Sequence, residues 1–214
     1  KNLLKFLKFI PEEAITDDLK KTNKFLVEED RDHFDYILSI SELANLEGNK
    51  HYGKRKQLNI FEKTYPNSVY QELDLNNPNI AGEITNVFIK WRDAKGKTEE
   101  NTSSEFLAIN RAIKHHRELK IYAIGIYNNN ELIGFAIADL EHTHFVEFHF
   151  VKADLSHKGI FAALYIYLAK NLHVNNYEFL NIEQDLGIPG LRMSKQQWKP
   201  VKYLKKYTIK RKVS

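Results

Sequence analysis

The sequence predicts an α+β fold in which a mixed sheet is flanked by helices. The prediction depends on the order of strand-like and helix-like segments and on an ordinary globular composition. Hydrophobic residues make up 43% of the 214 residues and charged residues 28%, which excludes a disordered chain. Cysteine is absent, so the sequence excludes disulfides and thiolate nucleophiles and is compatible with a cytoplasmic location. No apolar run approaches the roughly 18 residues that a transmembrane helix needs.

The first ten residues predict an amphipathic helix. Apolar residues recur at Leu3, Phe6, Leu7 and Ile10, which is helical spacing, with lysines between them. Such a helix would either pack on the core of this chain or lie on a membrane surface. The interrupting lysines, and the lack of a small-residue cleavage site after them, favour this helix over a signal peptide.

The middle of the chain predicts short strands and amphipathic helices. Strands are expected over residues 35–40 and 69–73, where β-prone side chains lie together. Helices are expected over four segments, where apolar residues recur every three or four positions: 41–47, 51–65, 80–91 and 103–116.

The last hundred residues predict a hairpin followed by alternating elements. Strands are expected over 121–127, 131–140, 144–152, 178–182 and 200–209, with Asn128-Asn-Asn130 as the first turn. Helices are expected over 159–172 and from about residue 190 to 197. The order β-β-β-α-β-α-β is similar to the plan of the GNAT acyltransferase fold, although fold order alone is weak evidence for function.

The junction before the predicted helix at residue 159 is a candidate donor-binding site. Backbone N–H groups at a helix start suit phosphate oxygens, and a glycine lets a ligand approach. Lys158 and Gly159 could therefore bind a phosphate or the donor carbonyl. Alternatively, Gly159 only starts the helix. A single glycine matches the usual coenzyme A loop poorly, which argues against coenzyme A as the obvious donor.

The densest group of polar residues follows the predicted strand at 178–182. Asn181, Glu183 and Asp185 alternate, and Arg192 and Lys195 lie one helical turn apart. A carboxylate can accept the proton of an attacking amine or hydroxyl, and a cation can stabilise an oxyanion. The alternative is a buried ion-pair network that braces the turn.

Two basic segments could attract a phosphate-bearing partner. Lys54 and Arg55 lie beside an aromatic residue, Tyr52, which suits a phosphodiester or a nucleobase. Residues 192–214 carry nine basic side chains and no acidic one. The plainer interpretation of both segments is a solvated surface.

The histidines give little sign of a metal site, and we predict none. His115 and His116 are adjacent and so point to different faces of a helix. His149 shares a strand face with Glu147, and the two could form a general-base pair or simply pack in the core.

The sequence contains two extended motifs: Asp35-Tyr-Ile-Leu-Ser with the later Gly48-x-Lys50-x-x-x-Lys54-Arg55, and Asn181-x-Glu183-x-Asp185-Leu-Gly-Ile-x-Gly190-Leu-Arg192-x-x-Lys195. Through these motifs the chain resembles a bacterial family of unknown function that is related to the C-terminal catalytic domain of phosphatidylglycerol lysyltransferase. Members of this family look like two GNAT-like halves in tandem. The resemblance implies that residues 1–66 are a helical linker region left from a first half, and that residues 67–214 form the acyltransferase domain.

The residues and the resemblance together predict an acyl- or aminoacyltransferase. Glu183 or Asp185 would act as base, with Arg192 and Lys195 positioning the substrate and Asn181 beside them. The resemblance implies aminoacyl-tRNA as donor, with acyl-coenzyme A left open, and tRNA or an anionic phospholipid headgroup as partner. The alternatives are a basic binding module without catalysis and a coenzyme A-dependent N-acetyltransferase. We expect a cytoplasmic protein that could associate peripherally with a membrane.

Overall fold

A computed structural model describes residues 6–140 and 144–212 and divides the chain into two compact units. Unit 2 comprises residues 39–180. Unit 1 comprises the described residues of 1–38 and 181–214, so it is built from both ends of the sequence. The division falls within two strands, β3 (Asp35–Ser39) and β8 (Phe179–Asn181).

Unit 2 is a β-sheet covered by helices on both faces. Its strands are β4 (Val69–Glu72), β5 (Ile121–Asn128), β6 (Glu131–Asp139), β7 (Phe145–Ala153) and the first residues of β8, side by side in that order. Its helices are α2 (Ile40–Asn45), α3 (Tyr52–Thr64), α4 (Pro78–Ala94), α5 (Glu99–Lys114) and α6 (Ile160–Val174).

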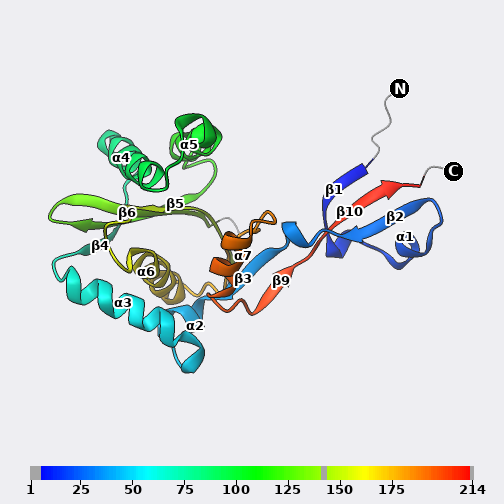
Figure 1. Cartoon of the computed structure of the whole chain (residues 1–214), viewed down its shortest axis with the longest axis horizontal. Coiled ribbons are helices and arrows are strands. Elements are labelled where there is room, and N and C mark those ends of the chain that lie inside the picture. The colour runs from blue at the N-terminus through cyan, green and yellow to red at the C-terminus, as the bar shows by residue number, and fades with distance from the viewer. Residues whose placement is uncertain (1–5, 141–143, 213–214) are drawn as a thin grey trace. The chain divides into compact units, whose positions relative to one another are not determined.

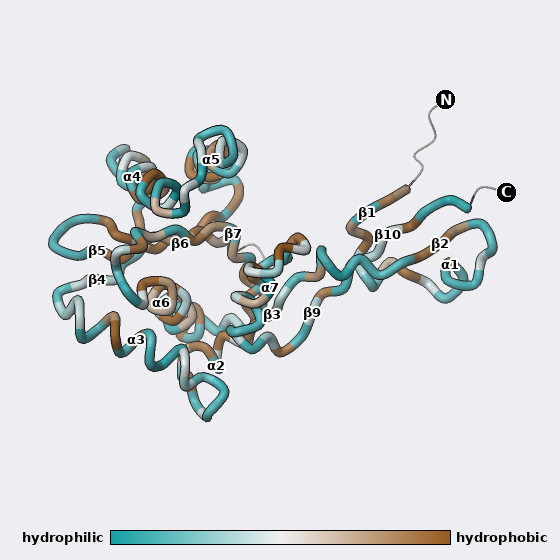
Figure 2. Tube along the Cα trace, viewed as in Figure 1, coloured by the Kyte–Doolittle hydropathy of each residue, from teal (hydrophilic) through white to brown (hydrophobic). Residues whose placement is uncertain are grey.

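The helices of unit 2 form a layer on each side of the sheet. Helices α4 and α5 lie on one face of β5 and β6, and α6 and α3 lie on the other (Figure 1). Strand β6 is buried over most of its length and is brown along much of its course in Figure 2, as expected for a strand covered on both faces. Helix α6 crosses from β7 to β8, and the Phe179 N–H donates to the His144 carbonyl at 3.0 Å, so the two strands start side by side.

Unit 1 contains two small groups of strands. In the first, β10 (Lys206–Arg211) pairs antiparallel with both β1 (Phe6–Pro11) and β2 (Phe25–Glu29). Helix α1 (Asp17–Lys21) precedes β2, and Ile15, Tyr207 and Ile209 form the buried core of this sheet. In the second group, β3 pairs antiparallel with β9 (Lys202–Leu204), and helix α7 (Pro189–Gln196) lies between β8 and β9 in the sequence.

Two predictions about the ends of the chain were wrong. The expected helix over residues 3–10 is strand β1 where the structure describes it, from Phe6 onward. Its aromatic and branched side chains suit a strand, and pairing with β10, about 200 residues away, overrides the helical spacing. The expected single strand over 200–209 divides into β9 and β10, which have different partners.

The remaining predicted elements are confirmed within a few residues, and the α+β class with them. The short elements α1 and β2 were not predicted. The predicted division between residues 66 and 67 lies inside unit 2, between α3 and β4, and as a statement about two GNAT-like halves it stays a prediction. Over residues 6–140 and 144–212, no helix has the length and apolar character needed to cross a bilayer.

Candidate functional site

The candidate site in unit 1 is built on the tight connection between β8 and α7. Asn181 is buried at the end of β8, and its side-chain oxygen accepts a hydrogen bond from the Glu183 N–H at 2.8 Å. This bond holds Glu183 in the left-handed region, with φ of 58°. Leu186 and Gly187 also have positive φ, so the chain reverses sharply before α7 begins. The connection is therefore fixed by side-chain hydrogen bonds as well as by backbone pairing.

Asp185 is the buried centre of this connection. Its carboxylate is fully buried and accepts two hydrogen bonds from Arg192, at 2.8 and 2.9 Å. Arg31 donates at 3.1 Å, the Tyr36 hydroxyl at 2.5 Å and the Gly187 N–H at 2.9 Å. Five donors thus occupy the two carboxylate oxygens.

The electrostatics of Asp185 follow from these contacts. Burial alone would raise its pKa, but the hydrogen bonds from Arg192, Tyr36 and Gly187 more than offset burial, and the pKa lies well below the usual range. Hydrogen bonds to Asp185 and Asp32 raise the pKa of Arg192. Burial and the bond to Asp185 raise the pKa of the Tyr36 phenol. Asp185 and Arg192 therefore both carry their charge at neutral pH, and the Tyr36 phenol keeps its proton.

These contacts favour a structural role for Asp185 and Arg192, and the catalytic roles expected of them stay predictions. A general base needs a free lone pair and a pKa near the working pH, and Asp185 has neither. Arg192 uses its Nε and one terminal nitrogen on Asp185 and Asp32, which braces the turn. This is the ion-pair network that the sequence left as the alternative.

Lys195 and Glu183 remain as the pair suited to chemistry. Lys195 donates to the Ile182 carbonyl, so its ammonium lies beside the strand end that carries Glu183. Burial lowers the pKa of Lys195 to about 8, opposed by the negative charges of Glu183, Asp35 and Asp185. Glu183 is half-buried. A half-buried carboxylate beside a largely desolvated ammonium can share a proton-transfer step at neutral pH.

The predicted donor-binding residues Lys54 and Arg55 belong to unit 2. Lys54 is buried in α3, and burial lowers its pKa to about 8, so it is not the surface cation that we expected. The Arg55 guanidinium donates to the carbonyls of Leu46 and Gly48, which end helix α2. The exposed cations of α3 are Lys56 and Lys63, which line a shallow groove of about 300 Å³ with Tyr52.

Gly159 is explained by packing. It precedes α6 with φ of 83°, and a Cβ there would lie 2.3 Å from the carbonyl oxygen of Gln57 in α3. The glycine therefore allows α6 to approach the α3 backbone. Lys158 beside it is exposed. A role for either residue in holding a donor stays a prediction.

Gly159→Ala is expected to destabilise unit 2 by about 2 kcal/mol or more, because the new methyl meets backbone and φ is positive. Denaturant unfolding followed at Trp91, which is buried in unit 2, measures the loss. Gly82→Ala is the matched control, since no atom lies within 4 Å of its Cβ and alanine favours the interior of α4. A Gly159→Ala variant as stable as the control would contradict the packing explanation.

The sequence did not reveal Arg31, Asp32 or Tyr36 as members of the site. Arg31 donates to the Tyr36 hydroxyl at 3.0 Å, and Asp32 accepts from Arg192 at 2.6 Å. All three lie about 150 residues before Asp185 in the sequence, and only folding brings them together. The one signal was the position of Tyr36 within the Asp35-Tyr-Ile-Leu-Ser motif.

Comparisons with known proteins agree with this fold. A conserved protein of unknown function from Bacteroides thetaiotaomicron is 28% identical, with a TM-score of 0.86 over 97% of this chain and 69% of that one. L-PGS from Bacillus licheniformis is 18% identical, with a TM-score of 0.69 over 98% of this chain and 68% of that one. Among curated proteins, none matches this chain.

The fold class is α+β: a mixed sheet flanked by helices. The chain belongs to the family described as phosphatidylglycerol lysyltransferase, C-terminal, whose profile matches residues 11–210. The match confirms the family that the two sequence motifs predicted. It also supports the prediction that the family is of the acyltransferase type.

Proposed function

We propose that this chain transfers an acyl or aminoacyl group from an activated donor to a hydroxyl or amine acceptor. The observation that carries the proposal is that the half-buried Lys195, whose ammonium interacts electrostatically with Glu183, lies at the turn after β8 in a chain of this family. Both residues belong to the motif through which the sequence resembles the family. The rest of the motif, Asn181, Asp185 and Arg192, holds the turn in place.

The proposed chemistry needs no covalent intermediate on the protein. Glu183 accepts the proton of the acceptor as its oxygen or nitrogen attacks the donor carbonyl carbon. The Lys195 ammonium stabilises the negative charge that develops on the carbonyl oxygen. The bond to the leaving group then breaks, and the proton held by Glu183 passes to that group. The absence of cysteine is compatible with this direct attack.

For the donor we propose aminoacyl-tRNA, as the family resemblance implied. The groove along α3 offers the exposed cations Lys56 and Lys63 beside Tyr52, a side chain on which a base can stack. In this proposal Lys56, Lys63 and Tyr52 contact the RNA. Lys54 does not, because it is buried, and Arg55 does not, because it donates to backbone carbonyls.

For the acceptor we propose an anionic phospholipid headgroup, which unit 1 would approach with one end of its three-stranded sheet. Phe6 and Leu26 flank Lys210 in register, and Phe25 lies opposite Arg211. The apolar side chains Phe6, Leu7, Phe25 and Leu26 are between 37% and 50% exposed. In Figure 2 the start of β1 is brown and the end of β10 is teal. Exposed apolar residues beside cations suit an anionic membrane surface.

The test of the function is a transfer assay with the full chain. Radiolabelled lysyl-tRNA is incubated with vesicles of phosphatidylglycerol, and label is measured in the lipid fraction. A parallel reaction supplies acetyl-coenzyme A and small amines. Label in the lipid fraction supports the whole proposal. Acetylation of an amine supports acyl transfer but not the proposed donor and acceptor. If neither reaction shows transfer, the proposal is contradicted.

Membrane association has its own prediction. The double variant Phe6→Ser, Phe25→Ser is expected to bind vesicles of equal phosphatidylglycerol and phosphatidylcholine at least about tenfold more weakly, since two apolar side chains contribute about 1.5–3 kcal/mol each when buried. Cosedimentation measures the binding. Val174→Ser is the control, because Val174 is exposed in unit 2. Equal binding by all three proteins would contradict the role of the sheet.

A further inference from the structure

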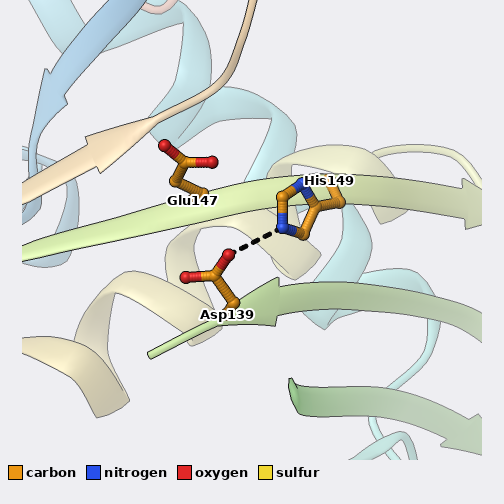
Figure 3. A group of neighbouring side chains, drawn as sticks. All are labelled: Asp139, Glu147 and His149. Atoms are coloured by element: carbon orange, nitrogen blue, oxygen red, sulfur yellow. Dashed lines mark hydrogen bonds and ion pairs between the residues drawn. The ribbon is translucent and has the colours of Figure 1, made fainter. Parts of the chain in front are cut away.

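Three metal-ligand side chains that the proposed reaction does not use meet in unit 2. Asp139 at the end of β6 and Glu147 and His149 in β7 each offer a ligand atom, and these atoms lie within 4.8 Å of one another. The His149 Nε2 lies 2.9 Å from a carboxylate oxygen of Asp139 (Figure 3). All three residues are partly buried, and each comes from regular structure that fixes its backbone.

The sheet register accounts for this meeting. Asp139 and Glu147 are directly paired residues of antiparallel strands, so their side chains point to the same face. Next to them the register shifts: Ala138 pairs with Phe148 and Ile137 with Phe150, which leaves His149 as the extra residue of a bulge. A bulge redirects a side chain and is common beside functional sites. Here it brings the imidazole to the two carboxylates.

The charges of the group favour a cation. Two carboxylates side by side on one face repel each other, and like charges directly opposite on paired strands destabilise a sheet. Asp139 and His149 keep side-chain exposures of only 19% and 26%, so water screens this repulsion incompletely. A divalent ion bound by both carboxylates and the imidazole would remove the repulsion.

The group also borders a cavity. Asp139 and His149 line a hollow of about 550 Å³ together with apolar side chains such as Leu107 and Ile121 and the cation Arg111. Three protein ligands leave coordination positions for water or a small molecule, which is the arrangement of catalytic rather than structural zinc sites. An anionic group bound to the ion could reach Arg111 from the same cavity.

We propose that Asp139, Glu147 and His149 bind a divalent transition-metal ion. Imidazole with carboxylates suits Zn²⁺ and Mn²⁺, and Zn²⁺ binds nitrogen and oxygen ligands more tightly than Mn²⁺ does. This site was not expected from the sequence, because His149 was considered only with Glu147 and the partner Asp139 comes from the neighbouring strand. The proposal does not depend on the transferase function.

Calorimetric titration of the chelator-treated full chain with ZnCl₂ tests the site. We expect one ion per chain in the micromolar range or tighter, and a rise in unfolding temperature with added Zn²⁺. Asp139→Asn and His149→Ala are each expected to weaken binding by about 100-fold or more, since loss of second-shell partners alone costs 10–100-fold. Asp139→Asn preserves shape, so it separates loss of a ligand from loss of folding.

A matched control is His115→Ala. The His115 Nδ1 lies 2.8 Å from a carboxylate oxygen of Glu118 on the surface, and among residues 6–140 and 144–212 this His–carboxylate pair has no third metal ligand beside it. The control is expected to bind Zn²⁺ as the parent chain does. The proposal is overturned if the parent chain takes up no Zn²⁺ at micromolar concentration, or if Asp139→Asn and His149→Ala bind it as tightly as the control.

Discussion

Asp185→Asn is expected to lower the free energy of unfolding of unit 1 by about 3–5 kcal/mol, the cost of removing one partner from a buried ion pair. The substitution preserves shape but leaves Arg192 and Arg31 facing a neutral amide, and that amide must turn an N–H toward one of the existing donors. Urea unfolding measures the effect. The chain has two tryptophans, and the buried Trp198 reports on unit 1. A Trp91→Phe background isolates its signal.

Asp32→Asn is the matched control for this variant. Asp32 binds the same Arg192, but its side chain is 56% exposed, so an effect of about 1 kcal/mol or less is expected. Equal losses in the two variants would contradict the description of Asp185 as the anchor of the turn.

The pH dependence of stability is a second measurement of the role of Asp185. Because the folded-state pKa of Asp185 is depressed, its contribution is fully present above the unfolded-state pKa of about 3.9 and is lost as pH falls toward the folded-state pKa. The parent chain should therefore lose stability of unit 1 below about pH 4. In Asp185→Asn this part of the acid dependence should be missing.

Glu183→Gln is expected to reduce kcat of the transfer reaction by about 100-fold or more, as loss of a general base does. Stability should change less than in Asp185→Asn, because Glu183 is only half-buried and the bond from its N–H to Asn181 does not involve its side chain. Glu13→Gln, an exposed change in unit 1, should leave kcat unchanged. A Glu183→Gln chain with full activity and the parent's folding would remove Glu183 from the mechanism.

Lys195 adds a pH profile to this prediction. If its ammonium stabilises the oxyanion, kcat/KM should fall as pH rises through about 8, where the side chain loses its proton. In Lys195→Arg the cation persists, so this fall should disappear even if the rate is lower. Lys54 also has a pKa of about 8, so the arginine variant is needed to assign the profile. A rate that instead rises through pH 8 would make the Lys195 amine the base.

Much of the fold followed from local patterns. The helices α3, α4, α5 and α6 and the hairpin β5–β6 were predicted because apolar periodicity and turn residues act over a few positions. Strand β1 was missed because its pairing with β10 is a contact between the two ends of the chain. The motif from Asn181 to Lys195 was predicted to carry the site, which stays a prediction. The difference in environment between Asp185 and Glu183 was not predictable, since two carboxylates look alike in a sequence.

The sequence by itself determined the fold class, the family and the stretch that carries the candidate chemistry, because these depend on local spacing and on residues that lie close together in the chain. The tertiary structure decided how deeply each of these side chains is buried and which partners it meets. Burial with five donors ties Asp185 into the fold, packing against α3 accounts for Gly159, and a bulge in β7 brings His149 to Asp139. Each of these depends on the burial and the partners of a side chain, which are set by segments distant in sequence.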